Sequence, residues 1–154
     1  MMAFFGKQSF PAMMARYIGL AAGQGQITTD VFKAGIENGS YDLVIDVRRQ
    51  DEWDSGHIPT AVHIPNETFE DDPFWTDVVL RDSSAETIVV YCRSGARAGA
   101  AIEKLKTMGY DGTLLNGMGV SQWNNAGYEL TLEDESAGTN LWRQAHTTSG
   151  QKKN

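Results

Sequence analysis

The chain has 154 residues, and 13 Lys and Arg against 20 Asp and Glu give it a net charge of −7. A hydrophobic fraction of 41% and a charged fraction of 21% are typical of one ordinary soluble domain, long enough to bury a core. The acidic balance argues against nucleic acid and against an anionic membrane as partners, so any anion site must be local.

Composition divides the chain into a central domain and two extensions. Residues 1–26 are too apolar for a disordered tail, and we expect a helix docked on the domain there. The alternative is that this extension makes a dimer contact and the protein is a homo-oligomer. Residues 27–132 are the predicted domain, and residues 133–154 form a polar extension in which we see no chemistry.

Strand and helix patterns alternate through the domain. Helices are predicted at 29–39, 50–55, 95–108 and around Trp123, and buried strands at 43–45, 61–64, 88–91 and 113–115. The acidic interval 66–86 carries enough apolar residues to predict another helix over the sheet. Short connections between alternating strands and helices favour an α/β fold of three layers, with a central, mainly parallel sheet and helices on both faces.

A single cysteine, Cys92, excludes an intrachain disulfide, a CxxC redox pair and a multi-cysteine zinc site. His57, His63 and His146 lack the spacing of metal ligands, and we expect no metal and no other cofactor. No stretch reaches the roughly 20 apolar residues of a membrane span, and the N-terminus does not match a secretory signal. The sequence therefore predicts a cytoplasmic protein.

Cys92 ends the most apolar strand, and the residues after it lead directly into a helix. Ligands of open parallel sheets bind at the carboxyl ends of strands, where the next helix presents unpaired N–H groups. The backbone amides and two guanidinium groups that follow the cysteine favour its thiolate form and an anionic substrate, against the alternative of an inert core cysteine. The residues that we expect to bind this substrate are Arg93, Ser94, Gly95, Ala96 and Arg97.

Several motifs resemble the single-domain rhodanese-like sulfurtransferases over about residues 27–130, in the order and spacing of that family. They are Leu43–Arg48, Glu52, Gly56–Pro59, Val89–Ala98, Leu105, Gly109–Tyr110, Trp123 and Gly127–Tyr128. The resemblance implies the α/β fold of that family and a Cys92 that carries sulfur as a persulfide. It also implies that Asp46 and Arg48 brace the active-site loop, although Arg48 and Glu52 are spaced to form a surface ion pair instead.

By the same resemblance, the Cys92 thiolate takes sulfur from an anionic donor such as thiosulfate and passes it to cyanide or a thiol, including a thiol of an acceptor protein. Some thiosulfate-specialised members have a basic residue where this chain has Glu52, which leaves the donor open. Without a second cysteine, an external acceptor is obligatory. The alternatives are a protein-to-protein sulfur relay and a cysteine-dependent phosphatase or arsenate reductase, although the latter class has a seven-residue loop and Cys92–Arg97 spans six.

Three further positions bear on this resemblance. His57, in the turn Gly56–Pro59, is interpreted as structural rather than as a base, since a thiolate stabilised by its loop needs none. Thr60 stands where the family usually has glycine, and Met118 stands where one glycine of a pair is common.

Overall fold

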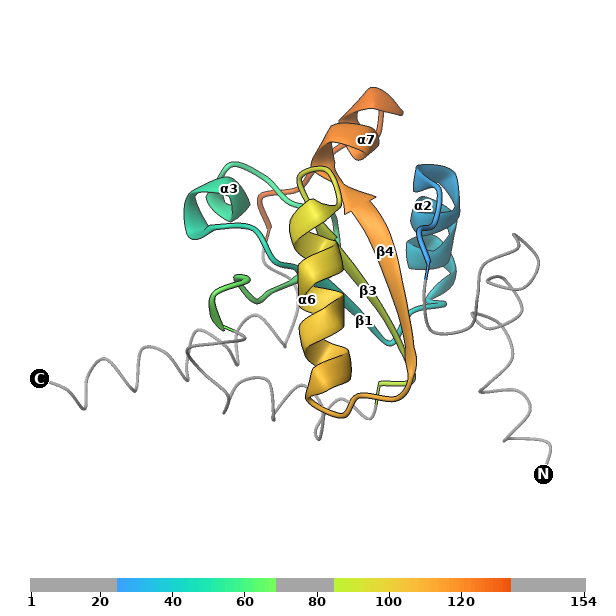
Figure 1. Ribbon diagram of the computed structural model, residues 1–154. Coiled ribbons are helices and arrows are strands. Elements are labelled where there is room, and N and C mark those ends of the chain that lie inside the picture. Colours follow the sequence, from blue (N-terminus) through green and yellow to red (C-terminus); the bar gives the residue numbers. More distant parts are fainter. Residues whose placement is uncertain (1–24, 69–84, 134–154) are drawn as a thin grey trace, which may run out of the picture.

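The computed structural model describes residues 25–68 and 85–133 (Figure 1). Most of the 1–26 extension with its expected docked helix or dimer contact, most of the helix expected at 66–86, and all but the first residue of the 133–154 extension lie outside the described residues.

Apart from the helix expected at 66–86, the predicted helices and strands are confirmed in their order. Helix α2 spans Thr29–Asn38, α3 spans Gln50–Asp54, α6 spans Ala96–Thr107 and α7 spans Val120–Asn125. Strand β1 spans Leu43–Asp46, β2 Val62–His63, β3 Thr87–Cys92 and β4 Thr113–Gly119. Local signals account for the helix ends: the Thr28 side chain accepts a hydrogen bond from the Val31 N–H, and Gly39 ends α2 in the left-handed conformation at φ 69°.

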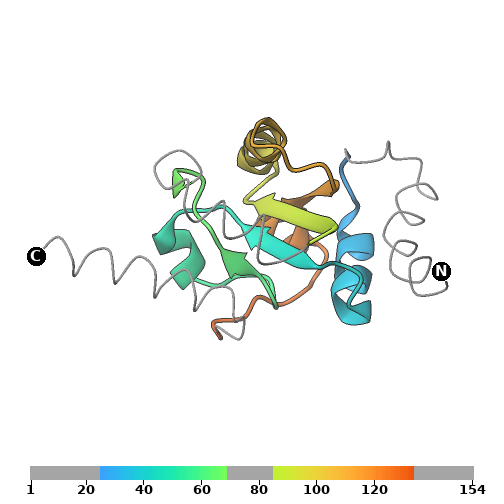
Figure 2. The same ribbon diagram turned by 90° about the horizontal axis from the view of Figure 1, so that it is seen from below.

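The four strands form one sheet in the order β2-β1-β3-β4, and each of these neighbouring strands pairs with the next in parallel. Helix α6 lies on one side of this sheet and α2 on the other (Figure 2). The predicted α/β fold with a parallel sheet between helices is therefore confirmed. All strands run toward the end of the sheet where α3 and α7 lie (Figure 1), so side chains that follow the strands gather there.

Two apolar clusters hold the layers together, and β3 contributes alternate residues to each. Ile88, Val90 and Cys92 pack with α6, while Val89 and Tyr91 pack on the opposite face with residues of α2 and α7. All of β3 is buried. A strand covered on both faces explains why this stretch is a continuous apolar run in the sequence.

Strand β4 is longer than predicted, because the glycine-rich segment after residue 115 continues the strand to Gly119. Val90 pairs with Asn116 and Cys92 with Gly119, so β4 has one more residue than β3 between these pairs, a β-bulge. Gly117 is needed inside the strand, since a Cβ atom there would lie 2.8 Å from the Phe32 ring and 2.9 Å from Val89. The glycine at this position therefore reflects close packing inside the strand.

The two residues that stand where the family usually has glycine, Thr60 and Met118, both have a strained backbone conformation. Thr60 has φ 73° and Met118 has φ 64°, and they are the described residues other than glycine with positive φ. A left-handed conformation costs a residue with a Cβ atom about 1–2 kcal/mol. The family's glycines at these positions therefore have a conformational reason, which this chain does not follow.

Thr60→Gly should raise the free energy of unfolding by about 0.5–1 kcal/mol, since the relieved strain exceeds the added entropy of the unfolded chain. Thr60 is exposed, so few contacts are lost. Chemical denaturation measures the change, with Thr107→Gly in α6 as the control, because that substitution relieves no positive φ and should destabilise. Equal destabilisation by both substitutions would contradict the account.

Candidate active site

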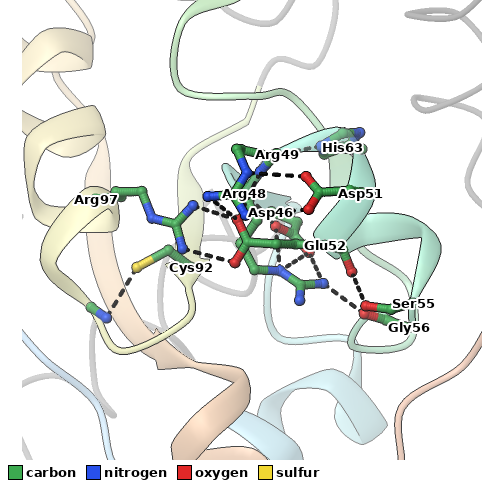
Figure 3. Close-up of polar contacts among 11 residues, drawn as sticks. Asp46, Arg48, Arg49, Asp51, Glu52, Ser55, Gly56, His63, Cys92 and Arg97 are labelled. Carbon is green, nitrogen blue, oxygen red and sulfur yellow. Dashed lines mark hydrogen bonds and ion pairs between the residues drawn. The ribbon is translucent and has the colours of Figure 1, made fainter.

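Cys92 is the last residue of β3 and is 1% exposed. Its Sγ accepts a hydrogen bond of 3.0 Å from the backbone N–H of Gly95 (Figure 3). Gly95 has φ 110° and immediately precedes α6, so this turn requires a residue without a Cβ atom. The helix thus begins where a backbone donor already points at the sulfur, an arrangement that favours negative charge there.

The rest of the loop is anchored from α7. The Arg93 carbonyl accepts a 2.9 Å hydrogen bond from the Ser121 N–H, and the Ser94 carbonyl accepts a 3.4 Å bond from the Gln122 side chain. Arg93, Ser94 and Ala96 are exposed, while Gly95 is buried. The loop predicted to bind substrate therefore has outward-facing side chains, with the Gly95 amide turned in toward the sulfur.

Arg97 is held by a carboxylate from another element. Its Nη1 and Nη2 donate to Glu52 Oε1 and Oε2 of α3 at 2.7 and 3.0 Å, beside Cys92 (Figure 3). The hydrogen bond from Arg97 lowers the pKa of Glu52 to about 2, and the same bond raises the pKa of Arg97. Both groups are therefore charged at neutral pH. The guanidinium expected to attract the donor already has a carboxylate partner, which the sequence analysis did not predict.

Asp46 and Arg48 form a buried ion pair at the end of β1, so the alternative pairing of Arg48 with Glu52 is wrong. Arg48 Nε donates to both Asp46 oxygens, and Nη2 reaches Oδ2 at 2.8 Å and the Gly56 carbonyl at 2.7 Å. The exposed fractions of these side chains are 4% for Arg48 and 0% for Asp46. Through these contacts the pair fixes the turn at Gly56. The hydrogen bonds described above between this part of the chain and the 92–97 loop come from Glu52, which pairs with Arg97, and not from Asp46 or Arg48.

The turn that begins at Gly56 is packed from both sides. The His57 ring stacks on Trp53 with centroids 3.5 Å apart, and its Nε2 lies 2.8 Å from the Glu133 carbonyl. Tyr91, next to Cys92, accepts a 3.0 Å hydrogen bond at its hydroxyl from the Ile58 N–H, and burial raises its pKa well above the usual value. These contacts place His57 in the packing of the turn.

Two residues of β4 contact the loop, and neither is among the site residues expected from the sequence. A Cβ atom at Gly119 would lie 2.1 Å from the Cys92 carbonyl oxygen, so the strands touch at the site. The Asn116 Nδ2 donates to the Gly95 carbonyl at 3.0 Å. The Gly119 position carried a signal in the glycine-rich pattern, whereas nothing in the sequence distinguished Asn116.

Among residues 25–68 and 85–133, no group of three or more His, Cys, Asp or Glu side chains is arranged to hold a metal ion. Within those same residues, no helix has the length and apolar character to cross a membrane.

Comparison with known proteins places this geometry in a family. The family model for the Rhodanese-like domain matches residues 28–126. The chain is 29% identical to thiosulfate:glutathione sulfurtransferase of Saccharomyces cerevisiae, covering 58% of this chain and 70% of the relative. It is also 29% identical to thiosulfate sulfurtransferase 18 of Arabidopsis thaliana, covering 74% of this chain and 90% of the relative.

Solved structures agree with this match, and some curated relatives are longer than the chain. A rhodanese-related protein from Thermoplasma volcanium is 27% identical with a TM-score of 0.57, covering 71% of this chain and 100% of the other. The chain spans 56% of an uncharacterized Synechocystis protein and 38% of a tRNA uridine(34) hydroxylase from Rickettsia typhi. With its parallel sheet, its Cys92 loop and the match over residues 28–126, the chain belongs to the rhodanese-like domain family.

Proposed function

We propose that the protein is a sulfurtransferase that moves sulfane sulfur from a thiosulfate-like anionic donor to a thiol or cyanide through a Cys92 persulfide. The observation that carries the proposal is the Gly95 N–H directed at Cys92 Sγ at the end of a buried strand. The family match and the sulfurtransferase relatives support sulfur transfer as the general activity. Thiosulfate as the donor follows from those relatives' names and from the positive groups of the loop.

The two half-reactions balance without a cofactor. The Cys92 thiolate attacks the outer sulfur of thiosulfate, the S–S bond of the donor breaks, and sulfite leaves with the electron pair. Cyanide, or a thiolate, then attacks the outer sulfur of the Cys92 persulfide; the S–S bond to Cys92 breaks, thiocyanate or a persulfide of the acceptor forms, and Cys92 keeps the electron pair as a thiolate. The Gly95 amide stabilises negative charge at this sulfur in both steps, and exposed Arg93 attracts the anionic donor.

The test is to incubate the protein with thiosulfate, measure the intact mass, then add cyanide and assay thiocyanate. We expect an adduct of one sulfur atom that cyanide removes, and no adduct in Cys92→Ser. Since Cys92 is the only cysteine, the adduct reports a single site. Absence of the adduct together with hydrolysis of a phosphate ester would replace this proposal with a phosphatase. Loading by a protein persulfide in the absence of loading by thiosulfate would identify a sulfur relay instead.

The Glu52–Arg97 ion pair predicts opposite effects of two substitutions on thiosulfate use. Glu52→Gln removes a negative charge beside Cys92 and should raise kcat/KM for thiosulfate about three- to tenfold. Arg97→Ala leaves that charge without its bidentate partner and should lower kcat/KM by a similar factor. Because the pKa of Glu52 is about 2, both effects should persist across neutral pH.

Steady-state rates of thiocyanate formation measure these effects, with Glu37→Gln as the control. Glu37 also pairs with a basic side chain, that of Lys33, but this pair lies on the exposed face of α2. An equal decrease in kcat/KM for Glu52→Gln and for Arg97→Ala would show that the ion pair only holds α3 against the loop and that the charge of Glu52 does not affect thiosulfate use.

A further inference from the structure

We infer that Asn116 is a positioning residue for the reacting sulfur and that it acts through Gly95. The inference rests on the proposed role of Cys92 as the reacting group. Asn116 lies in β4, on the strand next to β3, and is 9% exposed. Among the described contacts, Asn116 does not touch the sulfur. Its side chain bonds to the backbone of Gly95, and the Gly95 N–H bonds to the sulfur.

The side-chain amide of Asn116 connects two irregular pieces of backbone. Its Nδ2 donates to the Gly95 carbonyl at 3.0 Å, and its Oδ1 accepts from the Met118 N–H at 2.8 Å. Gly95 and Met118 both have positive φ, at 110° and 64°. For Met118, which has a Cβ atom, this conformation is strained and persists only where the surroundings hold it, whereas glycine adopts it readily. The buried Asn116 side chain thus bonds to both positive-φ residues at the site, Gly95 and Met118.

The bulge in β4 explains why an amide is needed at position 116. The extra residue between Asn116 and Gly119 takes Met118 out of the regular ladder with β3. Its N–H is then satisfied by Asn116 Oδ1. The other end of the same amide is free to bond across to the Cys92 loop, which an apolar residue in this strand would not do.

In the Cys92 loop, the Gly95 carbonyl accepts two hydrogen bonds. It accepts the Gly99 N–H at 3.0 Å as the first turn of α6, in addition to Asn116 Nδ2. These bonds fix the Gly95 residue whose N–H points at Cys92 Sγ. The Met118 side chain packs on the same glycine, since a Cβ atom there would lie 3.0 Å from Met118 Sδ. Without the Asn116 bond, only the α6 hydrogen bond and the packing of Met118 would orient Gly95, and the hydrogen bond to the sulfur should weaken.

The test uses thiol reactivity, because the chain has one cysteine and alkylation needs no sulfur donor. Asn116→Leu keeps the branched shape and the number of side-chain heavy atoms of asparagine, although its methyl groups are bulkier, and it removes both hydrogen bonds. We expect the rate of Cys92 alkylation by iodoacetamide at pH 7 to fall about three- to tenfold, with the pH midpoint of alkylation moved upward. The Gly95 amide resonance should also respond less to pH in the variant than in the wild type.

Leu115→Ala is the matched control. Leu115 is the buried neighbour in β4 and packs on the opposite face of the sheet, so the variant loses stability without losing a contact to Gly95. Its alkylation profile should match that of the wild type. If Asn116→Leu does not fold, Asn116→Ser carries the same test, because its side chain is too short to bond both partners.

An unchanged alkylation profile in a folded Asn116 variant would overturn the inference, as would an equal shift in Leu115→Ala. These outcomes are separate from those of the proposed function. A wild-type protein that forms no persulfide, but whose alkylation depends on Asn116, would refute sulfur transfer and leave the positioning role standing. If Asn116→Leu forms the persulfide as readily as the wild type and its alkylation profile is unchanged, sulfur transfer stands and the positioning role is refuted.

Discussion

Asp46→Asn should lower the free energy of unfolding by about 3–5 kcal/mol, because it leaves the guanidinium of Arg48 buried without its counter-charge. Asp46 accepts three side-chain hydrogen bonds from Arg48 and a 2.9 Å bond from the Arg48 backbone N–H. Little solvent reaches either group to compensate for the loss. Urea denaturation followed by fluorescence measures the change.

The chain supplies a control with the same residue types and spacing. Asp51 pairs with Arg49, also two residues apart, but these side chains are 71% and 64% exposed. Water screens this pair, so Asp51→Asn should change the unfolding free energy by less than about 1 kcal/mol. If both substitutions cost the same, burial would not be what makes the Asp46–Arg48 pair important.

Gly119→Ala should impair both stability and sulfur transfer. The added methyl group would lie 2.1 Å from the Cys92 carbonyl oxygen and 2.6 Å from the Arg93 carbonyl carbon. These are backbone atoms, so β3 and the loop must shift as a unit. We expect a loss of at least about 3 kcal/mol in unfolding free energy, at the upper end of overpacking costs. A displacement of the loop near 1 Å would lower kcat about a hundredfold.

Gly39→Ala separates this steric effect from the general cost of replacing glycine. Gly39 has φ 69°, and a Cβ atom there would meet nothing within 4 Å. The substitution should cost about 1–2 kcal/mol through left-handed strain alone and leave the rate of thiocyanate formation unchanged. A folded Gly119→Ala variant with normal kcat would contradict the close approach of β4 to the loop.

Local patterns in the sequence determined the elements and the position of the thiol. The continuous apolar run Ile88–Tyr91 predicted a buried strand, and the glycine and small residues after Cys92 predicted a tight turn into a helix. Both signals depend on neighbours along the chain, which is why they can be read from it. The same holds for the end of α2 at Gly39, while the capping side chain proved to be Thr28, the residue before the predicted start. The extent of β4 was missed because glycines needed for packing resemble glycines needed for a loop.

The partners of the charged and polar groups were decided only by the tertiary structure. Arg97 and Glu52 are 45 residues apart, and Asn116 and Gly95 are 21 apart, so no spacing rule links them. Spacing along the chain offered Arg48 both Asp46 and Glu52 as partners, and burial at the end of β1 selected Asp46. The sequence alone thus determined the fold class and the single thiol at a strand end. Parallel packing of the strands decided which charges and amides surround that thiol, because it brings the ends of distant segments together.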